Sequence, residues 1–150
     1  MYSIDETDRK ILTILQEDAR TPYSRISRMV NLSETAVRYR VSRLIKEGVI
    51  DRFTAMLNPR AVGYPLSAIV LVKVDPRRVK EAFDALAALP AASHVIQTAG
   101  DYDLVVVIHA ADNAELNRLA TRIRGMECVR EARVWMTTGL YKLDFRFKLL

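Results

Sequence analysis

Apolar residues recur at helical spacing in three segments near the start of the chain. The first segment begins after Asp5, whose carboxylate can cap a helix N-terminus. The second begins after Thr21, a potential cap, with Pro22 at the first helical position. The third runs from Ser33, another potential cap, to Gly48, which can take the left-handed conformation that ends a helix. Because only a tight turn separates the second and third segments, the pattern predicts a helix-turn-helix.

The third predicted helix has an apolar face formed by Val37, Val41, Leu44 and Ile45, and its opposite face carries hydroxyl groups and positive charge. Side chains near the N-terminus of such a helix can reach base edges in a DNA major groove, and basic ones can contact phosphate. We expect Ser33 and the helix that it caps to enter the groove. The expected base contacts are Thr35, Arg38, Tyr39 and Ser42, and the expected phosphate contacts are Arg40, Arg43, Lys46 and, more weakly, Arg25 and Arg28. Arg40 flanks the apolar face, so pairing with a neighbouring acid is the alternative for this residue.

Positive charge is concentrated in the two helices of this motif. From Arg20 to Lys46 there are seven basic residues and one acidic residue, Glu34, so this part carries +6 against +5 for the whole chain of 150 residues. A basic patch of this kind supplies affinity for phosphate, although basic helix faces are also common as ordinary solvated surface. The combination with a helix-turn-helix favours DNA binding.

The rest of the chain has strand and helix patterns in another order. Residues 49–57 show partial alternation, which is typical of a wing, and turn-forming residues fill 58–65. From Leu66 onward the expected order is β-α-β-β-α-β, with the first helix capped by Asp75 and the second by Asp112, and a further strand over Leu140 to Phe147. The predicted fold class is α+β: a winged helix-turn-helix over 1–57, a linker over 58–65 and a ferredoxin-like βαββαβ domain with an additional C-terminal strand over 66–150.

One face of the predicted sheet is covered by the two helices, and the other face is also apolar. It carries Ile69, Leu71, Val105 and Val107, which would form a large exposed patch in a single chain. We therefore expect a second copy of the domain to cover this face, which would also set two recognition helices at a spacing matched to two half-sites.

Candidate residues for other chemistry are sparse in this sequence. There is one cysteine, Cys128, and two distant histidines, His94 and His109, so we expect no metal site, no cofactor, no catalytic constellation and no enzyme activity. The first residues turn acidic at Asp5, so we expect no signal peptide. The longest apolar runs are strand-sized, so we expect a soluble cytoplasmic protein without membrane contact.

Four stretches in this order resemble the Lrp/AsnC family, the leucine-responsive and feast/famine regulators of bacteria and archaea: Asp5–Leu12, Leu32–Val41, Lys46–Ile50 and Gly100–Asp103. The resemblance covers nearly the whole chain, and the style of Ala36–Arg40 is that of the archaeal members. It implies a transcription regulator that forms dimers and higher assemblies, commonly octamers, with small effectors such as amino acids between dimers.

The resemblance also implies an effector site at the turn formed by Gly100, Asp101, Tyr102 and Asp103. Gly100 permits close backbone approach, and Asp101 or Asp103 can pair with an effector ammonium group. The alternative is an ordinary β-turn in which glycine and aspartate serve the turn geometry.

The chain departs from the family pattern on the fourth strand. Ala132 and Val134 stand where many members carry two threonines that help to hold the effector. Thr137 and Thr138 lie a few residues later and are the candidates to compensate for the missing hydroxyls, although strand threonines commonly serve only as β-formers.

The sequence thus predicts a sequence-specific DNA-binding transcriptional regulator that responds to an amino acid or a related small effector. One alternative is a DNA-compacting architectural protein without sequence preference. Another is an enzyme on the same fold, since sirohaem decarboxylases resemble this family in layout. The enzyme is disfavoured because the basic excess lies on the predicted recognition helices and not in the second domain.

Overall fold

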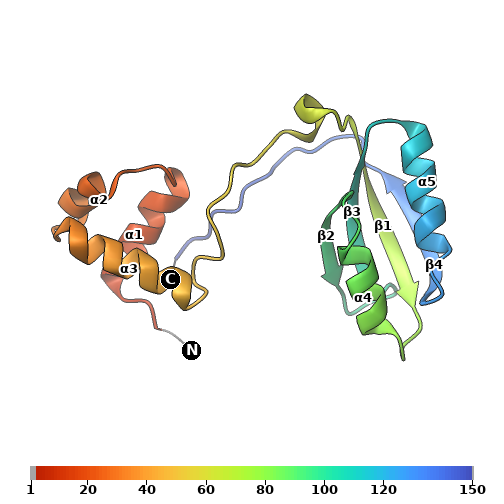
Figure 1. The fold of residues 1–150 in the computed structure, drawn as a ribbon, viewed down its shortest axis with the longest axis horizontal. Coiled ribbons are helices and arrows are strands. Elements are labelled where there is room, and N and C mark those ends of the chain that lie inside the picture. Colours follow the sequence, from red (N-terminus) through yellow and green to blue (C-terminus); the bar gives the residue numbers. More distant parts are fainter. Residues whose placement is uncertain (1–2, 150) are drawn as a thin grey trace. The chain divides into compact units, whose positions relative to one another are not determined.

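The computed structural model describes residues 3–149, which form two compact units. We call residues 3–55 with 142–149 the helical unit, and residues 56–141 the sheet unit. The first unit is built on helices and the second on a sheet with two helices (Figure 1).

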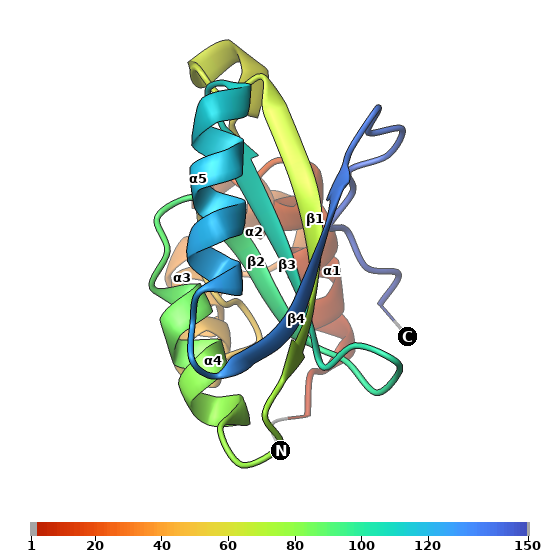
Figure 2. The same cartoon turned by 90° about the vertical axis from the view of Figure 1, so that its right-hand side faces the viewer.

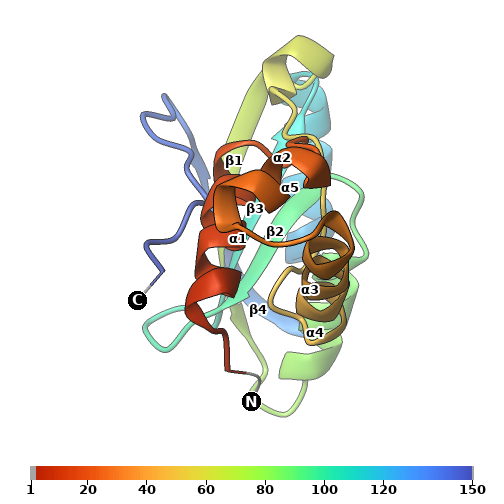
Figure 3. The ribbon, with the colours of Figure 1, turned by 90° about the vertical axis from the view of Figure 1, so that its left-hand side faces the viewer.

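The helical unit contains α1 (Glu6–Glu17), α2 (Tyr23–Val30) and α3 (Glu34–Lys46), shown together in Figure 3. Asp5 and Asp8 begin α1 with a reciprocal capping box, in which each carboxylate accepts a hydrogen bond from the backbone of the other. The helices bury one shared apolar cluster, whose members are Ile11, Leu15, Ile26, Val37 and Val41. The predicted helix-turn-helix is confirmed.

Local backbone geometry explains where these helices stop and start. Asn31, with φ at 55°, adopts the left-handed conformation between α2 and α3, and Gly48 does so after α3 with φ at 71°. The expected cap of α2 is wrong. Pro22 is the residue that precedes the helix, and the hydroxyl of Thr21 instead donates to the carbonyl of Asp18 at 2.8 Å.

The expected wing strand over residues 49–57 is not formed, since the structure assigns no regular secondary structure there. Val49 and Ile50 both donate their backbone N–H to the carbonyl of Leu44, so the start of this segment serves to terminate α3. Residues 51–57 are exposed, so alternating residues there have no buried face to fill.

The sheet unit follows a short 3₁₀ turn, Pro59–Val62. Its elements are β1 (Leu66–Val74), α4 (Val79–Ala87), β2 (Ala92–Gln97), β3 (Leu104–Ala110), α5 (Asn113–Arg124) and β4 (Val129–Met136). The strands are antiparallel in the order β2-β3-β1-β4, which confirms the predicted βαββαβ arrangement.

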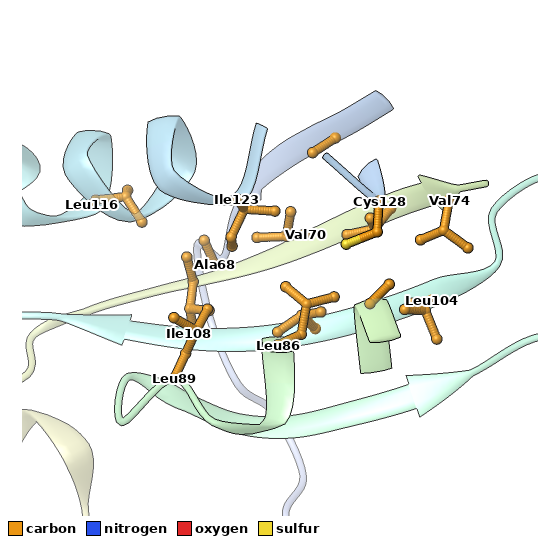
Figure 4. Packing of buried hydrophobic residues seen from close by; sticks show 14 of the residues in the cluster. Ala68, Val70, Val74, Leu86, Leu89, Leu104, Ile108, Leu116, Ile123 and Cys128 are labelled. Carbon is orange, nitrogen blue, oxygen red and sulfur yellow. The ribbon is translucent and has the colours of Figure 1, made fainter. Parts of the chain in front are cut away.

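Both helices cover the same face of this sheet (Figure 2). Side chains alternate along β1 and β3, so Ala68, Val70, Leu104 and Ile108 are fully buried against α4 and α5. Leu86 of α4 and Ile123 of α5 complete the core with the free thiol of Cys128 (Figure 4).

The other face of the sheet, which we call the open face, is not covered by α4 or α5. Ile69 of β1 lies between Val107 of β3 and Trp135 of β4, and Leu71 pairs in the same way with Val105. These side chains are half-buried or exposed, and 58% of Trp135 is accessible to solvent.

Helix α4 begins later than expected. Asp75 does not cap it, because its carboxylate accepts the backbone N–H of Arg77 at 2.9 Å and its carbonyl that of Arg78 at 2.8 Å. These bonds form a turn around Pro76, and Arg78 is the residue that precedes the helix. By contrast, Asp112 caps α5 as expected, through the backbone N–H of Glu115.

The expected strand over Leu140–Phe147 is also wrong, since residues 137–149 have no regular secondary structure. In place of a neighbouring strand, the terminal segment 142–149 contacts α1. The side-chain amide of Gln16 donates to the carbonyl of Phe147 at 3.1 Å and accepts its N–H at 2.7 Å. Arg146 donates to both carboxylate oxygens of Glu17 at 2.9 Å.

Candidate nucleic-acid and effector sites

Helix α3 presents one continuous polar face to solvent. Ser33 begins the helix by accepting the backbone N–H of Ala36 on its hydroxyl at 3.1 Å. Burial of Val37, Val41 and Leu44 directs the remaining face outward, whereas Ile45, expected on the apolar face, is exposed. The structure brings together six of the predicted DNA contacts on this face, all exposed: Thr35, Arg38, Tyr39, Ser42, Arg43 and Lys46.

Arg38 is held in place by two neighbours on the helical unit. Its guanidinium donates to the carboxylate of Glu34, one turn earlier, at 3.2 Å. The guanidinium carbon also lies 5.2 Å from the ring centre of Tyr23 in α2, within the range of a cation–π contact. Sequence reasoning missed both neighbours. The four-residue spacing of Glu34 and Arg38 could have revealed the first, whereas the second depends on how α2 packs against α3.

Arg40 does not share the outward face, and its expected phosphate contact is not supported by its position. Its Nη1 donates to Asp5 at 2.6 Å and to Asp8 at 2.8 Å. Asp8 is 1% exposed and the Arg40 side chain 29% exposed, so this is a largely buried ion pair between α3 and α1. The Asp8 backbone N–H and the Arg40 guanidinium together lower the pKa of the Asp5 carboxyl. The alternative of pairing with a neighbouring acid is the one that the geometry favours.

Further basic groups lie on α2, where Arg25 and Arg28 are exposed. With Arg43 and Lys46 they give the helix-turn-helix a positively charged surface, and Glu34 is the acidic residue within it. Such a surface attracts a polyanion, with an affinity that falls as salt rises.

The Gly100–Asp103 turn joins β2 to β3, and its two carboxylates have different surroundings. Asp103 accepts the backbone N–H of Val74 on its carboxylate at 2.8 Å and donates its own N–H to Val72 at 3.0 Å. These bonds fix the turn to β1. Asp101 is exposed, and a Cβ placed on Gly100 would meet no atom of the chain within 4 Å, so the tip of the turn is open to a ligand.

Tyr102 links the turn to charged residues at the edge of the open face. Sequence reasoning predicted Tyr102 at this site but missed its charged neighbours. Its hydroxyl donates to Glu131 at 3.3 Å, while Lys73 and Arg133 lie 5.2 and 5.8 Å from its ring centre. Arg133 also donates to Glu131 at 2.6 Å, which lowers the pKa of that carboxyl. Aromatic, cationic and anionic groups thus meet beside Asp101.

The structure does not bring Thr137 and Thr138 to this turn. The Thr137 hydroxyl donates to the carbonyl of Ser67, near the beginning of β1, whereas Asp103 binds Val74 at its end. At about 3.3 Å per residue, these positions are roughly 20 Å apart, too far for both to contact one small molecule within one chain. The positions of the two missing threonines, Ala132 and Val134, pack with the helix-covered core.

Polar side chains at the other end of the open face form a hydrogen-bonded chain. His109 contacts Ser67 through Nδ1 at 2.8 Å and Ser93 through Nε2 at 3.0 Å, and Ser93 in turn contacts His94 at 3.0 Å. Across the described range 3–149, there is no group of three or more side chains placed to hold a metal ion. The helices described in this range are also too short or too polar to cross a membrane.

Comparison with known proteins identifies both units. Residues 4–45 match the AsnC-type helix-turn-helix domain, and residues 67–145 match the Lrp/AsnC ligand binding domain. These two matches cover the helical motif and most of the sheet unit described above.

The chain is similar in sequence to transcriptional regulators from archaea. The chain is 35% identical over 139 residues to the HTH-type transcriptional regulator FL11 of Pyrococcus furiosus, covering 93% of this chain and 92% of that protein. It is 37% identical over 128 residues to the HTH-type transcriptional regulator LysM of Saccharolobus solfataricus, covering 85% and 88%.

Among solved structures, the leucine response regulatory protein LrpA of Mycobacterium tuberculosis superposes with a TM-score of 0.88 at 30% identity, covering 96% of this chain and 99% of that one. Agreement in sequence and fold extends over both units. The chain therefore belongs to the Lrp/AsnC family and is a helix-turn-helix transcriptional regulator with a ligand-binding domain.

Proposed function

We propose that α3 is the recognition helix and that it reads DNA sequence in the major groove. The observation that carries this proposal is the single outward face of α3, on which hydroxyl, aromatic and cationic side chains are all exposed above a buried apolar face. A helix of this width fits the major groove, and these groups match base edges and phosphate.

Different residues on this face take different roles. Arg38, near the middle of α3, is the best candidate for a bidentate contact to guanine, with Thr35, Tyr39 and Ser42 beside it. Arg43 and Lys46 lie in the last turn of the helix and contact phosphate, joined by Arg25 and Arg28 of α2. Arg40 has a structural role instead, because it is already paired with Asp5 and Asp8.

The test is binding of the purified protein to the DNA upstream of its own gene and to random DNA of the same length, at two salt concentrations. We expect at least a tenfold preference for the upstream fragment that persists at the higher salt. Equal, steeply salt-dependent binding to both fragments would favour the architectural alternative, and no binding to either would contradict a role in DNA recognition.

We infer that the Gly100–Asp103 turn holds a small zwitterionic effector such as an amino acid. Asp101 is the candidate for the ammonium group, because Asp103 is engaged by β1. Lys73 and Arg133, which flank Tyr102, offer positive charge for a carboxylate. Calorimetric titration of each common amino acid into wild-type protein and into Asp101→Asn tests this site. Binding that is unaffected by the substitution would place the effector elsewhere.

We further propose that the open face of the sheet is covered by a second copy of the chain. Its support is the row of apolar side chains around Ile69 and Leu71, which α4 and α5 do not cover. The dimer can associate into a higher oligomer such as an octamer.

We also propose that the protein works in the cytoplasm, because it acts on chromosomal DNA. Its role there is to bind DNA and an effector without catalysing a reaction.

A further inference from the structure

The position of Arg38 before DNA arrives points to a role for a residue outside the recognition helix. An exposed arginine normally samples many rotamers, and ordering it on a base edge opposes binding. The side chain of Arg38 is 62% exposed to solvent, yet its guanidinium contacts Tyr23 and Glu34 at the same time. These two contacts restrict the guanidinium to a small region above the surface of the helical unit.

Tyr23 is well suited to hold an arginine. It is the first residue of α2, directly after Pro22, whose carbonyl accepts the backbone N–H groups of Arg25 and Ile26. Its ring is half-buried and packs against the apolar cluster of the helical unit. One part of the ring is thus anchored in the core while its π-face lies 5.2 Å from the guanidinium.

The contacts leave Arg38 able to read a base. Glu34 takes a hydrogen bond from one guanidinium nitrogen, at 3.2 Å, out of five N–H donors that the group carries. The cation–π contact with Tyr23 acts through the positive charge of the guanidinium and needs only part of this five-donor group, so N–H donors remain for guanine. The arginine is therefore oriented without being blocked.

We propose that Tyr23 is a specificity-determining positioning residue that acts through Arg38. Through its cation–π contact with the guanidinium, it pre-organises Arg38 for a base contact, so that less ordering is needed when the major groove is entered. This inference rests on the proposed function of α3 as the recognition helix and extends it to a residue of the preceding helix.

The test compares the binding of variants to a DNA site enriched from a random library by the wild-type protein, and to random DNA. Tyr23→Leu keeps apolar bulk for the core but removes the ring, and Tyr23→Phe keeps the ring. We expect Tyr23→Leu to lower the ratio of specific to random binding by about threefold to tenfold, and Tyr23→Phe by less than about twofold. Tyr64→Leu, an exposed tyrosine of the sheet unit, is the matched control and leaves the ratio unchanged.

The same substitutions in an Arg38→Ala background show whether Tyr23 acts through Arg38. We expect Tyr23→Leu to change the ratio of specific to random binding no further once Arg38 is absent. Thermal unfolding of each variant checks that the helical unit is folded, and Tyr23→Phe, which preserves packing, gives a reading even if Tyr23→Leu is unstable.

Any other result would contradict either the proposed function of α3 or the positioning role of Tyr23. If Arg38→Ala leaves specificity intact, the base-reading role in the proposed function is wrong. If Arg38→Ala lowers specificity but Tyr23→Leu does not, Tyr23 has no positioning role and the proposed function stands. If Tyr23→Phe loses as much as Tyr23→Leu, or if Tyr23→Leu loses as much without Arg38, Tyr23 acts through its hydroxyl or independently of Arg38.

Discussion

At the scale of single residues, one arginine of α3 supports the fold, whereas Arg38 and Arg43 of the same helix are exposed. Arg40 lies within three residues of Arg43 on the same helix, but it turns towards α1 and meets Asp5 and Asp8. Because Asp8 is almost fully buried, removal of its partner would leave an uncompensated charge in the interior.

We predict that Arg40→Met destabilises the helical unit, whereas Arg28→Met, at an exposed position of α2, changes its stability by less than about 0.5 kcal/mol. The loss for Arg40→Met is about 2–3 kcal/mol, below the roughly 3–5 kcal/mol of a fully buried pair, because part of the arginine is exposed. Denaturant unfolding measures this difference. Equal unfolding midpoints for the two variants would show that the Arg40 ion pair does not support the fold.

Protonation of one histidine has a predictable effect on the sheet unit. Burial, and then the neighbouring His94, lower the pKa of His109 below its ordinary value of about 6.5. The unfolded chain therefore binds a proton more readily than the folded chain, so stability is present above about pH 6.5 and falls as the pH decreases below it.

We predict that wild-type protein loses unfolding free energy between pH 7 and pH 5.5, and that His109→Gln reduces this loss. Glutamine retains hydrogen-bonding capacity towards Ser67 and Ser93 but does not titrate. Denaturation at the two pH values is the measurement. An identical loss in wild type and His109→Gln would exclude this histidine as the cause.

At the scale of secondary-structure elements, most features that depend on local sequence were predictable, although the caps expected at Thr21 and Asp75 were wrong. The caps Asp5, Ser33 and Asp112 lie where short-range spacing placed them, and the alternation along β1 and β3 predicted the two faces of the sheet. Features that depend on distant partners were not. The charge pattern of α3 could not decide between DNA and α1 as the partner of Arg40, and alternation over 140–147 could not reveal that no strand lies beside it.

The contact of the terminal segment with α1 can be tested through one side chain. We predict that Gln16→Ala lowers the unfolding free energy of the helical unit by about 1 kcal/mol, because two hydrogen bonds to the backbone of Phe147 are lost. Lys10→Ala, on the same helix with an exposed ion pair to Glu6, is the control and changes stability by less than about 0.5 kcal/mol. If both variants unfold alike, the terminal segment does not stabilise α1.

At the scale of the whole molecule, the open face and the recognition helix make separate demands on the assembly. In the dimer that we propose, the open face buries its apolar side chains by pairing with an identical face, which gives twofold symmetry. Two copies of α3 then become available to one DNA molecule, which matches recognition of paired half-sites.

We predict that Ile69→Asp converts the protein to a monomer, because a charge is introduced into the middle of the open face. Thr121→Asp, on the exposed side of α5, is the control and leaves the assembly as in wild type. Light scattering after size-exclusion chromatography gives the mass, and circular dichroism checks the fold. A folded Ile69→Asp variant with the mass of wild type would place the interface elsewhere.

The most direct test of recognition by α3 is to modify single bases of the DNA and to compare their effect on wild-type protein and on Arg38→Ala. In the enriched site, each guanine in turn is replaced by 7-deazaguanine, which lacks the N7 acceptor exposed in the major groove. We predict that one replacement in each half-site weakens binding by wild-type protein and has no further effect on Arg38→Ala. Sensitivity that is absent at every guanine, or that is the same in Arg38→Ala, would contradict a major-groove contact by Arg38.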